Sequence, residues 1–207
     1  MKTILSRLLI ALCLGAPLAF AETPPEQIVR DTTDEILKIV RADKKSFEQD
    51  HRKLYKLADE KVLPHFDFVR MSQWVLGRHW RDATPEQRGR FVVEFRDLLV
   101  RTYSTALLNY TDQEIVVLPV ARKPGDEEVT VKTEVKQKGG APNVPIHYTF
   151  YKKGDAWKVY DVSIEGVSLV TNYRSVYATK IRAEGLEALL VSMAQSNRNP
   201  AAAGAKP

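Results

Sequence analysis

The residues best suited to chemistry in this sequence are one carboxylate, Asp161, and two tyrosines, Tyr148 and Tyr160. Asp161 interrupts an apolar segment, so burial could raise its pKa and make it a proton-accepting base. An isomerase that moves a proton next to a carbonyl group needs a buried carboxylate base beside a hydroxyl donor. In the alternative interpretation, Asp161 satisfies backbone groups at a strand bend or pairs with an arginine. The sequence positions no second catalytic group, so we favour this structural role and expect no catalysed reaction.

Signatures of other catalytic or metal-binding sites are missing from the sequence. It contains no GxSxG nucleophile motif, no phosphate-binding loop and no HExxH zinc motif. The four histidines, His51, His65, His79 and His147, have no recognised ligand spacing. His65 and Asp67 could form a polar pair, but Asp67 is better placed to cap a helix and His65 to lie on the surface. We therefore expect no metal site and no cofactor.

The first 21 residues have the pattern of a secretory signal peptide. Lys2 and Arg7 precede an apolar run that ends in the small-x-small sequence Ala19-Phe20-Ala21. The run is too short to span a membrane comfortably. We expect cleavage after Ala21 and export to a bacterial periplasm. The one cysteine, Cys13, lies in this leader, so the mature chain would contain no disulfide and would depend on its apolar core.

The charge balance is mildly basic. The whole chain has a formal net charge of +5, and without Lys2 and Arg7 of the leader the net charge is +3. Such a balance suits approach to anionic membrane surfaces. Basic and acidic residues are interspersed along the chain, so we expect no nucleic-acid partner.

Several helix boundaries can be read from local signals. Asp67 is predicted to cap a short helix that ends at Gly77, and Pro64 ends the helix before it. A further helical stretch begins at Thr171 and breaks near Gly185. Three capping boxes predict other helix starts, at Thr23–Glu26, Ser46–Gln49 and Thr84–Gln87.

After Tyr110 the apolar period changes from 3.6 to 2, which predicts strands. Short glycine-containing links between them indicate an antiparallel meander. Helices followed by consecutive strands are typical of an α+β fold, and no linker is long enough to divide the chain. We expect a single domain over residues 22–198 with a disordered tail at 199–207. The predicted strands are Ile115–Val120, Val129–Lys136, Pro145–Tyr151 and Trp157–Ile164.

The helix that follows Thr84 has an unusually broad apolar side. Phe91, Phe95, Leu99 and Tyr103 belong to a stripe roughly 140° wide, against the ~100° of an ordinary surface helix. The stripe could pack against the sheet as a closed core. It could equally form one wall of an apolar cavity, because both arrangements need the same residues to face inward.

Two segments resemble a known family. LPHFDFVRMSQWVLGRHWRDATPEQRGRFVVEFRDLLVRTY begins at Leu63, and WKVYDVSIEGVSLVTNYRS begins at Trp157. Together they resemble the MlaC family of periplasmic phospholipid-binding proteins, also called toluene-tolerance proteins. The resemblance runs from about Glu26 to Asn197, and its most specific parts include Val75-Leu76-Gly77 and Glu165-Gly166-Val167-Ser168-Leu169.

This resemblance implies a lipid carrier and not an enzyme. Members of the family have a cystatin-like α+β fold, in which a curved antiparallel sheet of about four strands and several helices enclose an apolar pocket. The pocket takes the acyl chains of a diacyl phospholipid, and the headgroup stays near solvent. The implied partners are the outer-membrane lipoprotein MlaA with a porin and the inner-membrane Mla ABC transporter, through its MCE-domain subunit. The implied role is to maintain outer-membrane lipid asymmetry, and we expect a monomer.

On this interpretation, apolar residues with inward parity line the pocket. Two other functions remain open from the residues alone: a periplasmic chaperone for apolar clients, and a small-molecule isomerase that uses Asp161. The expected lipid-binding residues are Met71, Val75, Leu76, Phe95, Leu99, Tyr103, Leu107, Val131, Val135, Ile146, Tyr148, Phe150, Val162 and Ile164.

Overall fold

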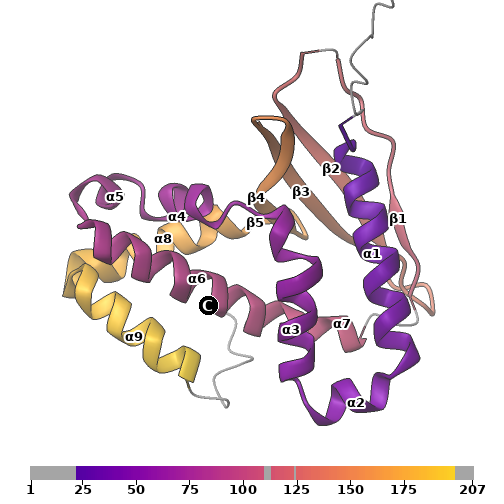
Figure 1. Cartoon of the computed structure of the whole chain (residues 1–207), viewed down its shortest axis with the longest axis horizontal. Helices are drawn as coiled ribbons and strands as arrows, with labels where there is room; N and C mark the ends of the chain where they lie inside the picture. Colours follow the sequence, from indigo (N-terminus) through magenta and orange to yellow (C-terminus); the bar gives the residue numbers. More distant parts are fainter. Residues whose placement is uncertain (1–21, 110–112, 124, 199–207) are drawn as a thin grey trace, which may run out of the picture.

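The structure is a computed structural model that describes residues 22–109, 113–123 and 125–198. The predicted leader and the predicted tail lie outside the described residues, so both stay predictions. Figure 1 shows a sheet on one side of the molecule with α1 in front of it, while α4, α5, α6, α8 and α9 gather on the other side and α3 lies between α1 and α6. Within the described residues, no helix combines the length and apolarity needed to cross a bilayer.

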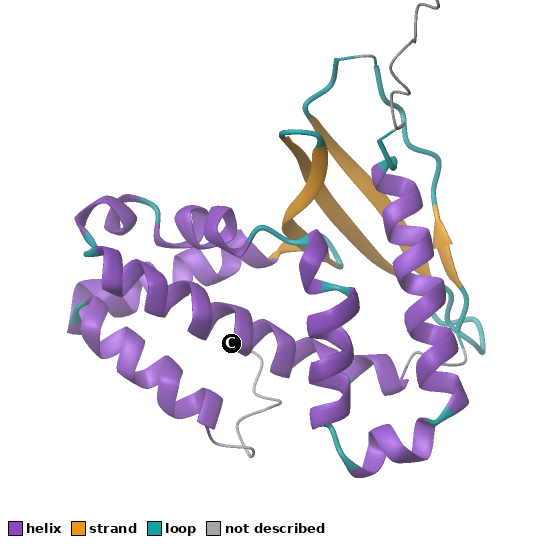
Figure 2. Cartoon of the chain, in the orientation of Figure 1, coloured by secondary structure: helices purple, strands orange, loops and turns teal. Residues whose placement is uncertain are grey.

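The helices precede and follow the strands (Figure 2), which confirms the predicted α+β class. The first helices are α1 (Pro25–Ala42), α2 (Lys44–Gln49), α3 (Arg52–Lys61), the 3-10 helix η1 (Leu63–His65), α4 (Phe68–Leu76), α5 (Arg78–Asp82), α6 (Pro85–Ser104) and α7 (Ala106–Asn109). The strands are β1 (Ile115–Val117), β2 (Glu128–Val135), β3 (Val144–Lys153), β4 (Ala156–Ile164) and β5 (Val167–Ser168), and the last helices are α8 (Leu169–Glu184) and α9 (Leu186–Arg198).

Two predicted helix starts are confirmed by their hydrogen bonds. Thr84 Oγ1 accepts from the backbone N–H of Gln87 at 3.1 Å, and Gln87 Oε1 accepts from the backbone N–H of Thr84 at 3.1 Å. Asp67 Oδ1 accepts from the backbone N–H of Arg70 at 2.9 Å. The predicted end of α4 is also confirmed, because Gly77 has φ of +54°, which favours glycine.

The other two capping boxes are wrong. α1 begins after Pro24, whose fixed φ of −64° suits a helix start, and no side chain caps it. Ser46 lies inside α2, which begins at Lys44. The single helix expected from Ser46 to Pro64 is divided at Asp50, whose carboxylate accepts from the backbone N–H of Arg52 at 3.1 Å and starts a new helix.

The sheet has five antiparallel strands in the order β1-β2-β3-β4-β5 among the described residues, where about four were expected. The added strand, β5, consists of Val167 and Ser168, which pair with β4 after a turn at Glu165 and Gly166. Two residues are too few to produce an alternating apolar pattern, so this strand could not be predicted from periodicity.

The strand register confirms the predicted parity of the sheet residues. Val131 pairs with Tyr148, which pairs with Val162, and all three lie on one face. The next row on that face contains Ile146 and Ile164. This face of the sheet therefore carries the apolar residues expected to point inward.

The first half of the apolar stripe of α6 packs against another helix, α8. The Phe91 and Phe95 rings stack at a centroid distance of 5.6 Å, and both side chains are fully buried. Two tyrosines of α8 meet them edge-on: Tyr173 lies 5.2 Å from Phe95 and Tyr177 lies 5.9 Å from Phe91. The first half of the stripe is thus a closed aromatic core.

Candidate functional site

The residues expected to bind lipid gather mainly in one apolar cluster between the sheet and the helices. Tyr103, Ile146, Tyr148 and Ile164 are partly buried and pack against this cluster. Val135 is buried on β2, and Leu107 packs against a second cluster formed by α1, α2 and α3. The expected residues that are buried within the main cluster are Met71, Val75, Leu76, Phe95, Leu99, Val131, Phe150 and Val162.

The partly buried members mark where the apolar interior retains accessible surface. Ile146 and Tyr148 of β3 and Ile164 of β4 share the inward face of the sheet, and Tyr103 lies near the end of α6. Burial raises the pKa of Tyr148 to about 12, because its phenolate would lie in an apolar setting. Tyr148 nevertheless keeps accessible surface.

Residues outside the expected set belong to the same region. Ile28 of α1, Leu98 of α6 and Val117 of β1 are partly buried and pack against the main cluster. Val117 pairs with Thr133, so it lies in the same row of the sheet as Ile146. Both Ile28 and Val117 lie in periodic apolar segments of the sequence, so the apolar periodicity could have identified them as part of the expected lipid-binding set.

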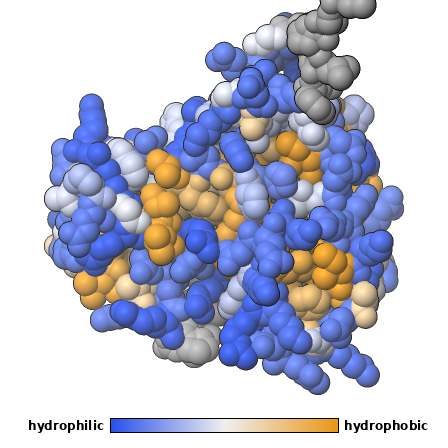
Figure 3. Space-filling model, viewed as in Figure 1, coloured by the Kyte–Doolittle hydropathy of each residue, from blue (hydrophilic) through white to orange (hydrophobic). Residues whose placement is uncertain are grey.

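Apolar side chains also reach the surface near this region. Figure 3 shows apolar residues in the area where Figure 1 draws α1 and α3, the helices that contribute to the second cluster. Leu76 has a different setting, since it lines a surface cavity together with Arg78, His79 and Arg174.

Asp161 is bound by groups at the start of α8. Its Oδ2 accepts from the Ser168 hydroxyl at 2.6 Å, and its Oδ1 accepts from the backbone N–H of Val170 at 3.1 Å. Asp161 pairs with Thr149 in the register, and Tyr148 lies on the opposite face of the strand pair. Tyr160 donates to Glu128 Oε2 at 2.8 Å. The three groups considered for isomerase chemistry therefore do not converge on one point.

Asp67 joins the start of α4 to β3. Its carboxylate is buried and accepts from the Tyr151 hydroxyl and from Lys153 Nζ, the latter at 2.7 Å. Burial by itself would raise the pKa of Asp67, but the hydrogen bonds from Lys153, Tyr151 and the backbone of Arg70 outweigh it and lower the pKa. The Arg70 guanidinium lies 3.8 Å from the centroid of the Tyr151 ring.

The suggested polar pair of His65 with Asp67 finds no support in these contacts, since the Asp67 partners are Arg70, Tyr151 and Lys153. His65 is half-buried, and burial followed by the nearby charge of Lys158 lowers its pKa. Over the described ranges, no group of three or more His, Cys, Asp or Glu side chains is placed to hold a metal ion.

The chain is similar to proteins of one known family. The family model described as MlaC protein matches residues 30–195 of the chain. The intermembrane phospholipid transport system binding protein MlaC of Haemophilus influenzae is 26% identical over 184 residues, which cover 88% of this chain and 86% of that protein. The toluene tolerance protein ttg2D of Pseudomonas putida is 30% identical over 187 residues, which cover 89% of this chain and 86% of that protein.

A solved structure is similar over most of the fold. It is the phospholipid-binding protein of Ralstonia solanacearum, determined in complex with a phospholipid. The TM-score is 0.78 and the sequence identity is 31%, and the match covers 85% of this chain and 98% of that chain.

Proposed function

Since the chain belongs to the MlaC family, we propose that it is a periplasmic carrier that holds a diacyl phospholipid in an apolar pocket. The observation that carries this proposal is the likeness, along nearly its whole length, to the R. solanacearum protein that was solved with a phospholipid. The arrangement of apolar side chains between sheet and helices supports it independently.

The acyl chains would lie against the inward face of the sheet, at Ile146, Tyr148 and Ile164, with Tyr103 of α6 and Ile28 of α1 opposite. These side chains are apolar or aromatic and keep accessible surface. The buried members of the cluster pack against one another, so entry of two acyl chains would require the helices to move away from the sheet. The aromatic core of α6 and α8 would remain closed during this movement.

The physical need for such a carrier follows from the cost of exposing lipid to water. At about 0.8 kcal/mol per methylene, two long acyl chains cost on the order of 20 kcal/mol to transfer from hydrocarbon to water. A protein pocket of similar apolarity makes the transfer nearly isoenergetic. Direction would then come from the partners, for which we propose the MlaA lipoprotein with its porin and the MCE-domain subunit of the Mla ABC transporter. The result would be maintenance of outer-membrane lipid asymmetry.

We expect spontaneous loss of lipid to be slow, because the chains must leave an apolar pocket for water. The test is a transfer assay in which the protein, loaded with fluorescent phospholipid, is mixed with acceptor vesicles that contain or lack the MCE-domain subunit. The proposal predicts slow transfer to bare vesicles and a strong acceleration by the subunit. Equally rapid transfer to both vesicle types would leave a passive lipid-binding protein. Failure to load phospholipid at all, with suppression of the aggregation of unfolded proteins, would favour the chaperone.

A further inference from the structure

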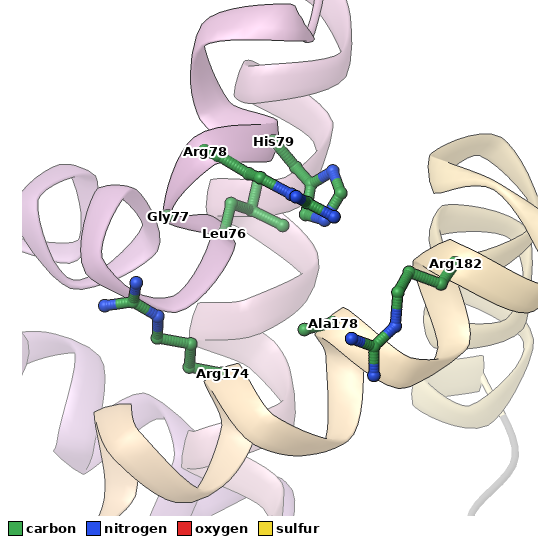
Figure 4. A pocket seen from close by; sticks show the side chains of 7 residues that line it. All are labelled: Leu76, Gly77, Arg78, His79, Arg174, Ala178 and Arg182. Carbon is green, nitrogen blue, oxygen red and sulfur yellow. The ribbon is translucent and has the colours of Figure 1, made fainter.

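Two adjoining surface cavities lie where the turn between α4 and α5 meets α8. Their volumes are about 220 Å³ and 260 Å³, and they share Gly77 and Arg174. We call the larger surface that they form the arginine groove. The first cavity is lined by Leu76, Gly77, Arg78, His79, Arg174, Ala178 and Arg182 (Figure 4), and the second adds Gln73 and Trp74.

The walls of the arginine groove are cationic and no acidic residue lines them. In the described part of the chain, neither Arg78 nor Arg174 forms an ion pair or a hydrogen bond, and Arg182 bonds only the Thr179 hydroxyl, at 3.2 Å. Three arginines elsewhere form ion pairs, namely Arg52, Arg96 and Arg90, the last with Glu187 at 2.6 Å. Like charges that gather without a counter-charge favour an anionic ligand.

The local backbone brings these cations close to the turn. A Cβ atom at Gly77 would lie 3.2 Å from a terminal nitrogen of Arg174, so this guanidinium lies directly against the turn. Figure 4 shows Arg78 and His79 on one side of the cavity and Arg174, Ala178 and Arg182 along α8 on the other. Cationic groups therefore come to the groove from two elements that are far apart in the sequence.

The groove also offers apolar contact. Leu76 and Ala178 are lining residues, and Trp74 beside them is 47% exposed. Trp and Arg are the residue types enriched at the energetic centres of protein interfaces. A bilayer surface is broad and is contacted by side chains that protrude from a protein, whereas a recess with basic walls accepts a protruding acidic side chain. These features favour a protein segment over a membrane surface.

We propose that the arginine groove docks a protein partner through a segment that presents an Asp or Glu next to an apolar residue. This inference rests on the proposed function, in which the partner is a membrane-bound component of the lipid transport system. In Figure 1 the α5 end of the molecule lies away from the sheet, so docking there leaves the apolar face of the sheet free to hold or release lipid.

The experiment measures binding of the purified protein to open membrane fragments from the source bacterium. Three surfaces are compared: the native fragments, the same fragments after protease treatment, and liposomes made from their extracted lipid. The variants are Arg174→Glu, Arg182→Glu and the milder Arg174→Gln. The matched control is Arg30→Glu, which makes the same charge change on an exposed position of α1.

The docking proposal predicts that the wild type and Arg30→Glu bind native fragments, and that the Arg174→Glu with Arg182→Glu double variant binds at least about tenfold more weakly. Arg174→Gln, which removes charge without reversing it, should fall between them. Protease treatment should abolish binding, and liposomes should bind weakly. Increasing salt should weaken the wild-type interaction.

Three results would overturn the proposal: no wild-type binding to native fragments, undiminished binding of the double variant, or liposome binding as strong as fragment binding and equally dependent on Arg174. The last result would assign the groove to an anionic membrane surface. Bound phospholipid is measured by solvent extraction in the same preparations. If the double variant no longer docks but has normal lipid content, the carrier proposal stands. If the wild-type protein contains no lipid, the carrier proposal is contradicted, but the docking result still stands.

Discussion

Asp67 lies almost fully buried at the start of α4, and donors from three residues meet at its carboxylate. The sequence predicted one of these contacts, the helix cap, because capping depends on local spacing. It could not predict Tyr151 or Lys153, which are more than eighty positions away and reach Asp67 through the fold. The arginine groove escaped prediction for the same reason, since Arg78 and Arg174 are brought together only by the packing of α4 against α8.

Replacement of Asp67 by Asn should lower the free energy of unfolding at pH 7 by about 1–3 kcal/mol, because Tyr151 loses an ionised acceptor. The folded-state pKa of Asp67 is lowered, so its stabilising contribution is present above the unfolded value of about 3.9 and is lost as pH falls below it. Denaturant unfolding between pH 2 and 7 should therefore show a weaker acid-induced loss of stability in the variant.

The matched control for this prediction is Asp34→Asn, at an exposed position of α1. It should change stability by less than about 0.5 kcal/mol. Equal effects of the two substitutions at pH 7 would show that the hydrogen bonds to Asp67 contribute little.

Replacement of Asp161 by Ala should destabilise the protein without changing its bound lipid. The substitution leaves the backbone N–H of Val170 and the Ser168 hydroxyl without their acceptor, at a cost of about 1–3 kcal/mol. Thermal unfolding gives the stability and solvent extraction gives the lipid content. A folded variant of normal stability that has lost a measurable enolisation activity of the wild type would restore the isomerase hypothesis.

At the scale of elements, strands and long helices could be predicted and the space between them could not. The reciprocal bonds of Thr84 and Gln87 agree with the sequence, because this motif acts within one turn. Alternating apolar residues also placed Val131, Tyr148 and Val162 on one face. Periodicity shows only that Phe95 and Ile146 both point inward. The structure separates them, since Phe95 lies in a closed aromatic core while Ile146 keeps accessible surface.

The two faces of β3 provide a test of the lipid site. Ile146→Glu places a charge on the inward face, where Ile146 keeps some accessible surface, so the protein should fold while its retained phospholipid falls by at least about half. His147→Glu, on the other face of the same strand and opposite Lys132, is the matched control and should keep its lipid. Leu99→Glu is a harsher test, because Leu99 is buried in the main cluster.

Lipid content is measured by extraction from equal amounts of folded protein, with circular dichroism as the folding criterion. Full lipid occupancy in a folded Ile146→Glu variant would show that the acyl chains lie elsewhere. Equal loss in the His147→Glu control would point to a general disturbance of the sheet.

At the scale of the whole molecule, the two regions for which we propose different tasks lie apart. The apolar region between the sheet and helices α1 and α6 would hold lipid, and the arginine groove at α4, α5 and α8 would meet a partner. The aromatic core of Phe91, Phe95, Tyr173 and Tyr177 packs α6 against α8. Movement of these helices together, relative to the sheet, would therefore open the lipid site without breaking the aromatic contacts.

Bound lipid should stabilise the whole fold, because it binds the folded chain and not the unfolded one. Stabilisation of about 2–3 kcal/mol, expected near a hundredfold excess of lipid over its dissociation constant, corresponds to roughly 5–10 °C in the melting temperature. Calorimetry of the protein before and after removal of lipid with organic solvent, followed by refolding, measures the difference. Reloading with phospholipid should restore the higher melting temperature, and identical melting temperatures would contradict a lipid-filled interior.

The central claim, that this protein carries phospholipid, is tested most directly by native mass spectrometry of the protein purified after export. The carrier account predicts a complex heavier than the mature chain by the mass of diacyl phospholipid, and fragmentation of the released ligand should yield a phosphate headgroup and two acyl chains. A single species with the mass of the chain alone, or a bound molecule that is not a phospholipid, would contradict the account.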